Sequence, residues 1–170
     1  MKAERGDEAL RRFRISQPGT DYFITATIAG KSPEGLSPAS KDSIRRELLA
    51  IEADYHWRIR GAVIMPDHLH LLVTLGGNLG LSRVMARLKS KTRSHLMMKD
   101  GLTWQPNFYE HRLRVNESQQ EILRYIFLNP YRAKLLGLTD AYPWHWVGEA
   151  EQAWLEPQTD NGRPFPEWLR

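Results

Sequence analysis

The sequence lacks cysteine altogether, and it also lacks any long run of apolar residues. Without cysteine the chain can form neither disulfides nor thiolate zinc sites, and it has no cysteine nucleophile. Without about 18 consecutive apolar residues it has no candidate transmembrane helix, so we expect no membrane partner. The opening residues, MKAERGDEALRR, lack the apolar centre of a secretory signal peptide. These absences predict an intracellular protein.

Charge is unevenly distributed along the 170 residues, with a net +4 from 24 Lys and Arg against 20 Asp and Glu. Residues 61–135 hold 11 basic and 5 acidic side chains, whereas residues 136–170 hold 2 basic and 6 acidic ones. The basic centre indicates a polyanionic partner, although a solvated helix face gives the same pattern. The length favours one domain, placed at residues 1–150, and proline near the end predicts an extended tail at 151–170.

The hydrophobic pattern predicts strands and helices in an α+β order. Strands are expected where β-branched and apolar residues cluster, at 22–28, 57–65, 68–75 and within 104–115. Helices are expected after the turn-rich segment 30–40, from an N-cap at Ser82 to about residue 98, and after a capping box at Asn116. The last helix should end near Pro130, because a residue before proline avoids the α conformation. This order fits a ferredoxin-like antiparallel sheet covered by helices.

Two histidines in the expected strand 68–75 are the clearest functional candidates. His68 and His70 stand two positions apart, so both imidazoles should point to the same face of the sheet. Leu69 between them would point into the core. Two polar rings on one face of an otherwise apolar strand need a partner, and a shared metal ion is one. The alternative is a pair of exposed or hydrogen-bonded histidines without a metal.

A tyrosine and an asparagine in the segment LRYIFLNPYR form the second candidate. Tyr125 and Asn129 are four residues apart, which places them on one helix face. Ile122 and Ile126 adjoin that face, so Tyr125 should point toward the body of the protein. The alternative is a packed tyrosine whose hydroxyl finds a hydrogen-bond partner.

Three segments together resemble a known family: MPDHLHLLV at 65–73, WQPNFYEHRLR at 104–114 and LRYIFLNPYRAKL at 123–135. They resemble the REP-associated tyrosine transposases of bacteria, an IS200-like branch of the single-tyrosine HUH transposases. The resemblance covers roughly residues 20–146 and implies an HUH fold for the domain at 1–150. It implies a metal-dependent single-strand DNA endonuclease and strand transferase that recognises REP-type hairpins. Such enzymes cleave and rejoin DNA through a 5′-phosphotyrosine.

The resemblance also implies roles for individual residues. Tyr125 would be the catalytic nucleophile, assisted by His68 and His70. These two histidines and Asn129 would hold a divalent metal, Mg²⁺ or Mn²⁺, that polarises the scissile phosphate. Phosphate contacts and base stacking are expected from the basic helix and the strand after it, at Arg83, Arg87, Lys89, Lys91, Arg93, Trp104, Phe108, Arg112 and Arg114.

Two other functions compete with strand transfer. A domesticated hairpin DNA-binding protein with little or no catalysis is the first, but it has no need of both histidines and Tyr125 together. A hydrolase that uses the two histidines with water is the second, and it would never trap a protein–DNA adduct. The expected partner is a single-stranded DNA segment next to a hairpin, in the bacterial cytoplasm at the nucleoid. A monomer with Tyr125 acting in cis and a homodimer acting in trans both stay open.

Overall fold

Alternating side chains build the centre of the fold, which a computed structural model describes for residues 16–169. In β1 (Asp21–Ala29) every second residue is buried, as expected for a strand with one tightly packed face. In β2 (Trp57–Ile64) and β3 (His68–Leu75) most residues of both faces are buried. These strands pair antiparallel in the order β1, β3, β2, which puts β3 in the middle of the sheet.

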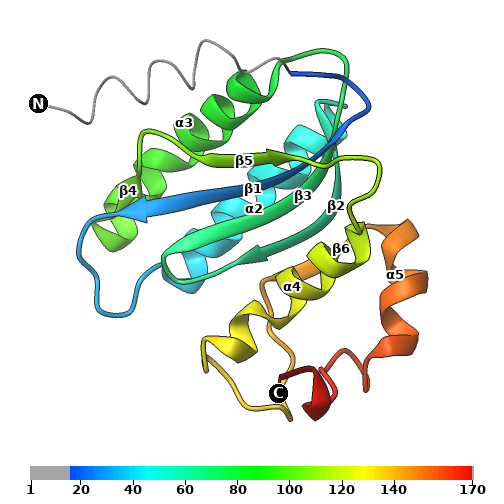
Figure 1. Ribbon diagram of the computed structural model, residues 1–170. Coiled ribbons are helices and arrows are strands. Elements are labelled where there is room, and N and C mark those ends of the chain that lie inside the picture. The colour runs from blue at the N-terminus through cyan, green and yellow to red at the C-terminus, as the bar shows by residue number, and fades with distance from the viewer. Residues whose placement is uncertain (1–15, 170) are drawn as a thin grey trace, which may run out of the picture.

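Shorter strands extend the sheet on both sides. β4 (Thr103–Trp104) and β5 (Tyr109–Arg112) pair with β1, and β6 (His145–Val147) pairs with β2. The helices of the described residues are α2 (Pro38–Ala53), α3 (Leu81–Asp100), α4 (Gln119–Arg132) and α5 (Glu149–Leu155). This arrangement confirms the predicted α+β fold with an antiparallel sheet covered by helices (Figure 1). None of the helices in residues 16–169 is long and apolar enough to cross a membrane.

The two faces of the sheet carry different helices. α2 and α3 lie side by side over one face, where Leu71 of β3 belongs to the same core cluster as Leu48 and Leu88 (Figure 1). α4 packs on the other face, where its Ile126 joins Leu72 in a second cluster. Because side chains alternate along a strand, the residues of β3 next to the main-core leucines face α4. His68 and His70 are among them.

The start of α3 differs from the prediction. The helix begins at Leu81 after Gly80, so Ser82 lies inside the first turn and does not cap it. The Leu81 N–H instead donates to the Ser16 hydroxyl at 2.8 Å. A hydroxyl distant in the sequence therefore takes over part of the capping that Ser82 was expected to provide.

Both ends of α4 also differ from the prediction. Its N-cap is Ser118, whose hydroxyl accepts a hydrogen bond from the Glu121 N–H at 3.3 Å, and not Asn116. The helix continues through Pro130 to Arg132. Proline there removes one helical hydrogen bond, but Pro130 and Tyr131 are both buried, and this packing offsets the loss.

The last residues are not extended, contrary to the expectation for 151–170. They form α5 and two short 3-10 helices, Glu156–Gln158 and Pro166–Leu169. Leu155 is buried with Phe127 and Leu128 of α4, and the Trp168 ring meets Phe127 edge-on at 6.1 Å. Apolar side chains at helical spacing outweigh the prolines here. The first 15 residues of the expected domain lie outside the described residues.

A polar cluster ties the start of α4 to the sheet and to α5. Arg60 lies where the pairing of β2 with β3 shifts by one residue, so its side chain leaves the regular strand pattern. Its guanidinium donates to Asp21 at 3.2 Å, to Gln119 at 2.6 Å and to Glu151. Asp21 also accepts hydrogen bonds from Gln119 and from Thr74. The first turn of α4 is thereby held over the edge of β1.

Candidate active site

The turn between β2 and β3 fixes the position of the first histidine. The Met65 N–H donates to the His68 carbonyl at 2.8 Å, which closes a turn around Pro66. On the outside of this turn lies Gly35, whose φ is 69°. A Cβ at Gly35 would lie 2.4 Å from the Pro66 carbonyl oxygen, so glycine is required for this close approach. The turn that carries His68 is therefore fixed both by its own hydrogen bond and by its contact with Gly35.

The two imidazoles meet through their Nε2 atoms, which are 3.1 Å apart. Their Nδ1 atoms have partners of their own. His68 Nδ1 is 2.6 Å from Asp67 Oδ1, and His70 Nδ1 is 2.8 Å from the Thr25 hydroxyl. Each outer partner fixes the orientation of its ring, as carboxylates and hydroxyls do for metal-binding histidines. The result is a pair of Nε2 atoms directed at one point.

This geometry fits a divalent metal. Two nitrogens bound at right angles to an ion at about 2.1 Å lie about 3.0 Å apart, close to the observed separation of the Nε2 atoms. Within residues 16–169 no group of three His, Asp or Glu side chains converges as a metal site. An amide oxygen is therefore a candidate for the third protein ligand.

Burial keeps His70 in the form that binds metals. Desolvation is the main cause that lowers the pKa of His70 to about 4, and the nearby His68 lowers it further while Asp67 acts in the opposite direction. His70 is 6% exposed. At neutral pH its imidazole is uncharged, and in the tautomer in which Nδ1–H donates to the Thr25 hydroxyl, the Nε2 lone pair is available for a ligand.

Tyr125 lies next to the histidine pair and is open to solvent. Its ring centroid is 5.3 Å from that of His70 and 5.9 Å from that of Phe23, edge-on to both. Phe23 in turn stacks on His70 at 5.5 Å. The Tyr125 side chain is 41% exposed, whereas that of His70 beside it is 6% exposed. The structure thus brings together three predicted site residues, His68, His70 and Tyr125.

Asn129 lies one helical turn beyond Tyr125 and is half-buried. Its side chain forms no hydrogen bond with the other residues of 16–169, and its role as a metal ligand stays a prediction. The hydroxyls of two other tyrosines are already hydrogen-bonded to backbone carbonyls. The Tyr131 hydroxyl donates to the Asp140 carbonyl at 2.9 Å, and the Tyr142 hydroxyl donates to the Ile64 carbonyl at 2.9 Å.

The residues expected to contact DNA fall into two groups. Several have structural partners: Arg87 pairs with Glu47 and Asp54, Lys89 donates to the carbonyls of 105 and 107, and Trp104 is 7% exposed with its indole N–H on Thr92. Phe108 is partly buried against the main core. The others are exposed cations on α3 or on and just after β5, and among them Arg112 also donates to Gln17 Oε1 at 3.2 Å: Arg83, Lys91, Arg93, Arg112 and Arg114. Their DNA contacts stay predictions.

The basic helix and the histidines occupy opposite faces of the sheet. α3 packs on the face of Leu71, whereas His70 faces α4. The bonds from Lys89 to the loop before β5 place α3 beside the β5 edge. On β5, Tyr109 lies opposite Thr25, which itself lies opposite His70. A strand of DNA that crosses this edge would pass from the basic helix to the histidine face.

Sequence reasoning missed three side chains that complete the site. Asp67 and Thr25 hold the imidazoles, and Phe23 supports both His70 and Tyr125. Asp67 could have been noticed because it adjoins His68. Phe23 and Thr25 share one face of β1 by alternation, but only the register of β1 against β3 shows that Thr25 lies opposite His70.

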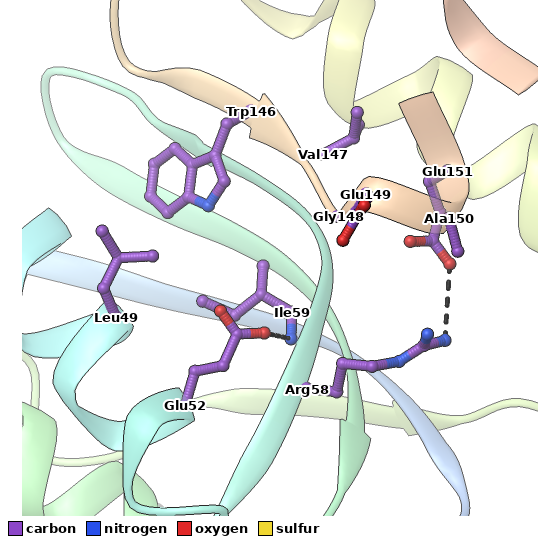
Figure 2. A pocket seen from close by; sticks show the side chains of 10 residues that line it. All are labelled: Leu49, Glu52, Arg58, Ile59, Trp146, Val147, Gly148, Glu149, Ala150 and Glu151. Atoms are coloured by element: carbon purple, nitrogen blue, oxygen red, sulfur yellow. Dashed lines mark hydrogen bonds and ion pairs between the residues drawn. The ribbon is translucent and has the colours of Figure 1, made fainter. Parts of the chain in front are cut away.

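Another cavity lies away from the histidine pair, at the edge of β2 beside β6 and the start of α5 (Figure 2). Its volume is about 710 Å³. Glu52 accepts a hydrogen bond from the Ile59 N–H at 2.7 Å, and Arg58 forms an ion pair with Glu151 at 3.5 Å; both are drawn as dashed lines in Figure 2. The lining contains three carboxylates, from Glu52, Glu149 and Glu151, and one cation, Arg58. Such a lining repels phosphate, so this cavity is a poor site for DNA.

Comparison with known proteins matches these features. The family model described as "Transposase IS200 like" matches residues 36–128, a span that holds both histidines and Tyr125. The match covers more than half of the chain, and the chain belongs to this family of transposases.

Two relatives confirm the resemblance to REP-associated tyrosine transposases. The REP-associated tyrosine transposase of Escherichia coli (strain K12) is 25% identical over 123 residues, which cover 72% of each chain. A solved structure of a REP-associated tyrosine transposase bound to a REP hairpin superposes with a TM-score of 0.66. It is 22% identical, and the match covers 78% of this chain and 79% of that one. This superposition shows that the two proteins share a fold.

Proposed function

We propose that this protein is a metal-dependent single-strand DNA endonuclease and strand transferase that recognises REP-type hairpins. The observation that carries the proposal is the pair of Nε2 atoms, 3.1 Å apart, beside the exposed ring of Tyr125. The related proteins support DNA as the partner, since one of them is a REP-associated tyrosine transposase bound to a REP hairpin.

The chain's residues would divide the chemistry among them. His68, His70 and Asn129 would hold Mg²⁺ or Mn²⁺, and the bound ion supplies positive charge that polarises the scissile phosphate. Asp67 and Thr25 keep the two Nε2 atoms in place. Phe23 packs against both His70 and Tyr125, which fixes the nucleophile relative to the metal ligands.

Cleavage would be a transesterification, in which one phosphoester bond replaces another and the energy of the bond is conserved. The Tyr125 oxygen attacks phosphorus, the bond from phosphorus to the 3′-oxygen breaks, and a 5′-phosphotyrosine forms. The phenolic proton leaves to solvent, which reaches the 41% exposed side chain, and the departing 3′-oxygen takes a proton from solvent. Attack by a 3′-hydroxyl on the phosphotyrosine reverses these steps and rejoins DNA without ATP.

One chain supplies both the tyrosine and the histidines in this arrangement. We therefore propose that Tyr125 acts in cis and that a monomer is sufficient. The exposed cations of α3 and β5 would bind the hairpin backbone, which places the single-stranded flank over the β5 edge. Mixing His68→Ala with Tyr125→Phe protein tests the cis arrangement. The mixture should stay inactive, whereas a trans dimer would regain cleavage.

The decisive test of the function is Tyr125→Phe with a labelled REP-type hairpin that carries a single-stranded flank. The variant should lose cleavage and the covalent adduct, detected by denaturing gels and mass spectrometry, yet keep hairpin binding. Tyr109→Phe is the matched control, because Tyr109 is 59% exposed on the same sheet face and should still allow adduct formation.

Three other results would each show which part of the proposed function is wrong. An adduct with Tyr125→Phe would show that another tyrosine is the nucleophile. Tight hairpin binding by the wild-type protein without any cleavage, with Mg²⁺ or Mn²⁺ present, would favour the domesticated binding protein. Release of cleaved product without a trapped adduct would favour a hydrolase.

A further inference from the structure

A second, shallow hollow of about 270 Å³ opens directly beside Tyr125. Phe23 contributes one wall from β1, and Ile122 and Tyr125 contribute the other from successive turns of α4. Glu121 completes the lining. The hollow is below the size of sites for drug-sized ligands, which suits one small ring system.

The chemistry of the lining side chains determines what kind of group can bind in the hollow. Phe23, Ile122 and Tyr125 offer aromatic and aliphatic surface, so the occupant needs an apolar face. Glu121 is the charged member, and its carboxylate would repel a phosphate. The occupant must therefore be a flat group that can donate a hydrogen bond from its edge. An unpaired nucleobase has both properties.

We infer that this hollow binds the unpaired base next to the phosphate that Tyr125 attacks, an inference that rests on the proposed function. Tyr125 is both a wall of the hollow and the proposed nucleophile, so a base seated there lies within one nucleotide of the scissile bond. Seating the base would hold the phosphate within reach of the Tyr125 hydroxyl, which lowers the entropic cost of the attack.

Glu121 makes the hollow selective. Its backbone is fixed in the first turn of α4 by the hydrogen bond from its N–H to Ser118, which places its side chain at the rim of the hollow, within reach of an occupant. A carboxylate accepts a hydrogen bond from an exocyclic amino group, as acidic side chains do with cytosine. Adenine, cytosine and guanine carry an exocyclic amino group, whereas thymine offers only its N3–H, which lies between two carbonyl oxygens that a carboxylate repels. Thymine should therefore be disfavoured at this position.

The experiment uses the full-length protein with Mn²⁺ and a REP-type hairpin whose single-stranded flank is fully randomised. Covalent adducts and released ends are isolated and sequenced to locate the cleaved phosphate. We expect thymine to be depleted by about fivefold or more at one position flanking it. Glu121→Gln should remove most of this depletion, because an amide can also donate to thymine. Glu149→Gln, an exposed carboxylate in the cavity at the edge of β2, is the control and should leave it unchanged.

A binding measurement separates this inference from the proposed cleavage. Flanks with 2-aminopurine at each position in turn report stacking by quenched fluorescence, with no need for cleavage. Quenching at one position, reduced in Ile122→Ser, supports the hollow as a base site. If wild-type protein forms no adduct but this quenching occurs, the cleavage proposal fails and the base site stands. Equal use of all four bases beside the cleaved phosphate, or unchanged selectivity in Glu121→Gln, overturns the inference even when the adduct forms.

Discussion

Replacing Arg60 by methionine should lower the free energy of unfolding by about 3 kcal/mol. Methionine keeps the apolar length of the side chain and removes the guanidinium that bridges Asp21, Gln119 and Glu151. The side chains of Asp21 and Glu151 are 12% and 5% exposed, so the substitution leaves two desolvated carboxylates without their main cation. Removing one partner of a buried ion pair typically costs about 3–5 kcal/mol.

The lower end of that range applies because the carboxylates keep other partners. Asp21 still accepts a hydrogen bond from Thr74, and Arg58 stays 3.5 Å from Glu151. Arg58→Met is the matched control, since Arg58 contacts the same carboxylate but is 54% exposed. An exposed pair of this kind contributes up to about 1 kcal/mol.

Urea unfolding followed by circular dichroism measures both variants. Arg60→Met should shift the midpoint strongly with an unchanged slope, and Arg58→Met should shift it little. The double variant Arg60→Met with Glu151→Gln should lose less than the sum of the single losses, because the two groups interact. Equal losses for Arg60→Met and Arg58→Met, or additive losses in the double variant, would refute the assignment of Arg60 as the buried bridge.

Two further predictions concern histidines. Burial lowers the pKa of His145 to about 4, below the ordinary value of 6.5, so the unfolded chain binds more protons between these values. Stability should therefore fall as pH drops from 6.5 toward 4, and His145 contributes up to about 1.4 kcal/mol per pH unit to this fall. Because the pKa of His70 is also lowered to about 4, His145→Asn should reduce the slope of a urea-midpoint series over this window without abolishing it, and an unchanged slope would contradict the prediction. At the candidate metal site, calorimetry should show no Mn²⁺ binding by His68→Ala and binding about 10–100-fold weaker by Asp67→Asn, since Asp67 orients the His68 ring. Wild-type affinity in Asp67→Asn would show that this contact is dispensable.

The strand pattern was sufficient to predict the histidine pair. Alternation along 68–75 puts His68 and His70 on one face of the strand, and helical spacing puts Tyr125 and Asn129 on one face of their helix, whatever the tertiary structure. Thr25 could not be assigned in the same way, because its contact with His70 depends on the register between strands far apart in the sequence. Predictions from local sequence failed where contacts with residues distant in the sequence determine the structure. Pro130 stays within a helix because its surroundings bury it, and Trp104 enters the core because β4 pairs with β1.

The basic residues of α3 and the histidine–tyrosine site lie on opposite faces of the sheet, and this separation determines how DNA would have to be bound. A duplex bound along α3 cannot reach Tyr125 directly, because the sheet lies between them. A flexible single strand can cross the β5 edge, where Tyr109 and Thr25 lead toward His70. A hairpin with a single-stranded flank has both parts in one molecule, and this argues for such a substrate over a plain duplex. A substitution that blocks the β5 edge should therefore reduce the rate of cleavage more than the affinity for the hairpin, because only the single-stranded flank has to pass this edge.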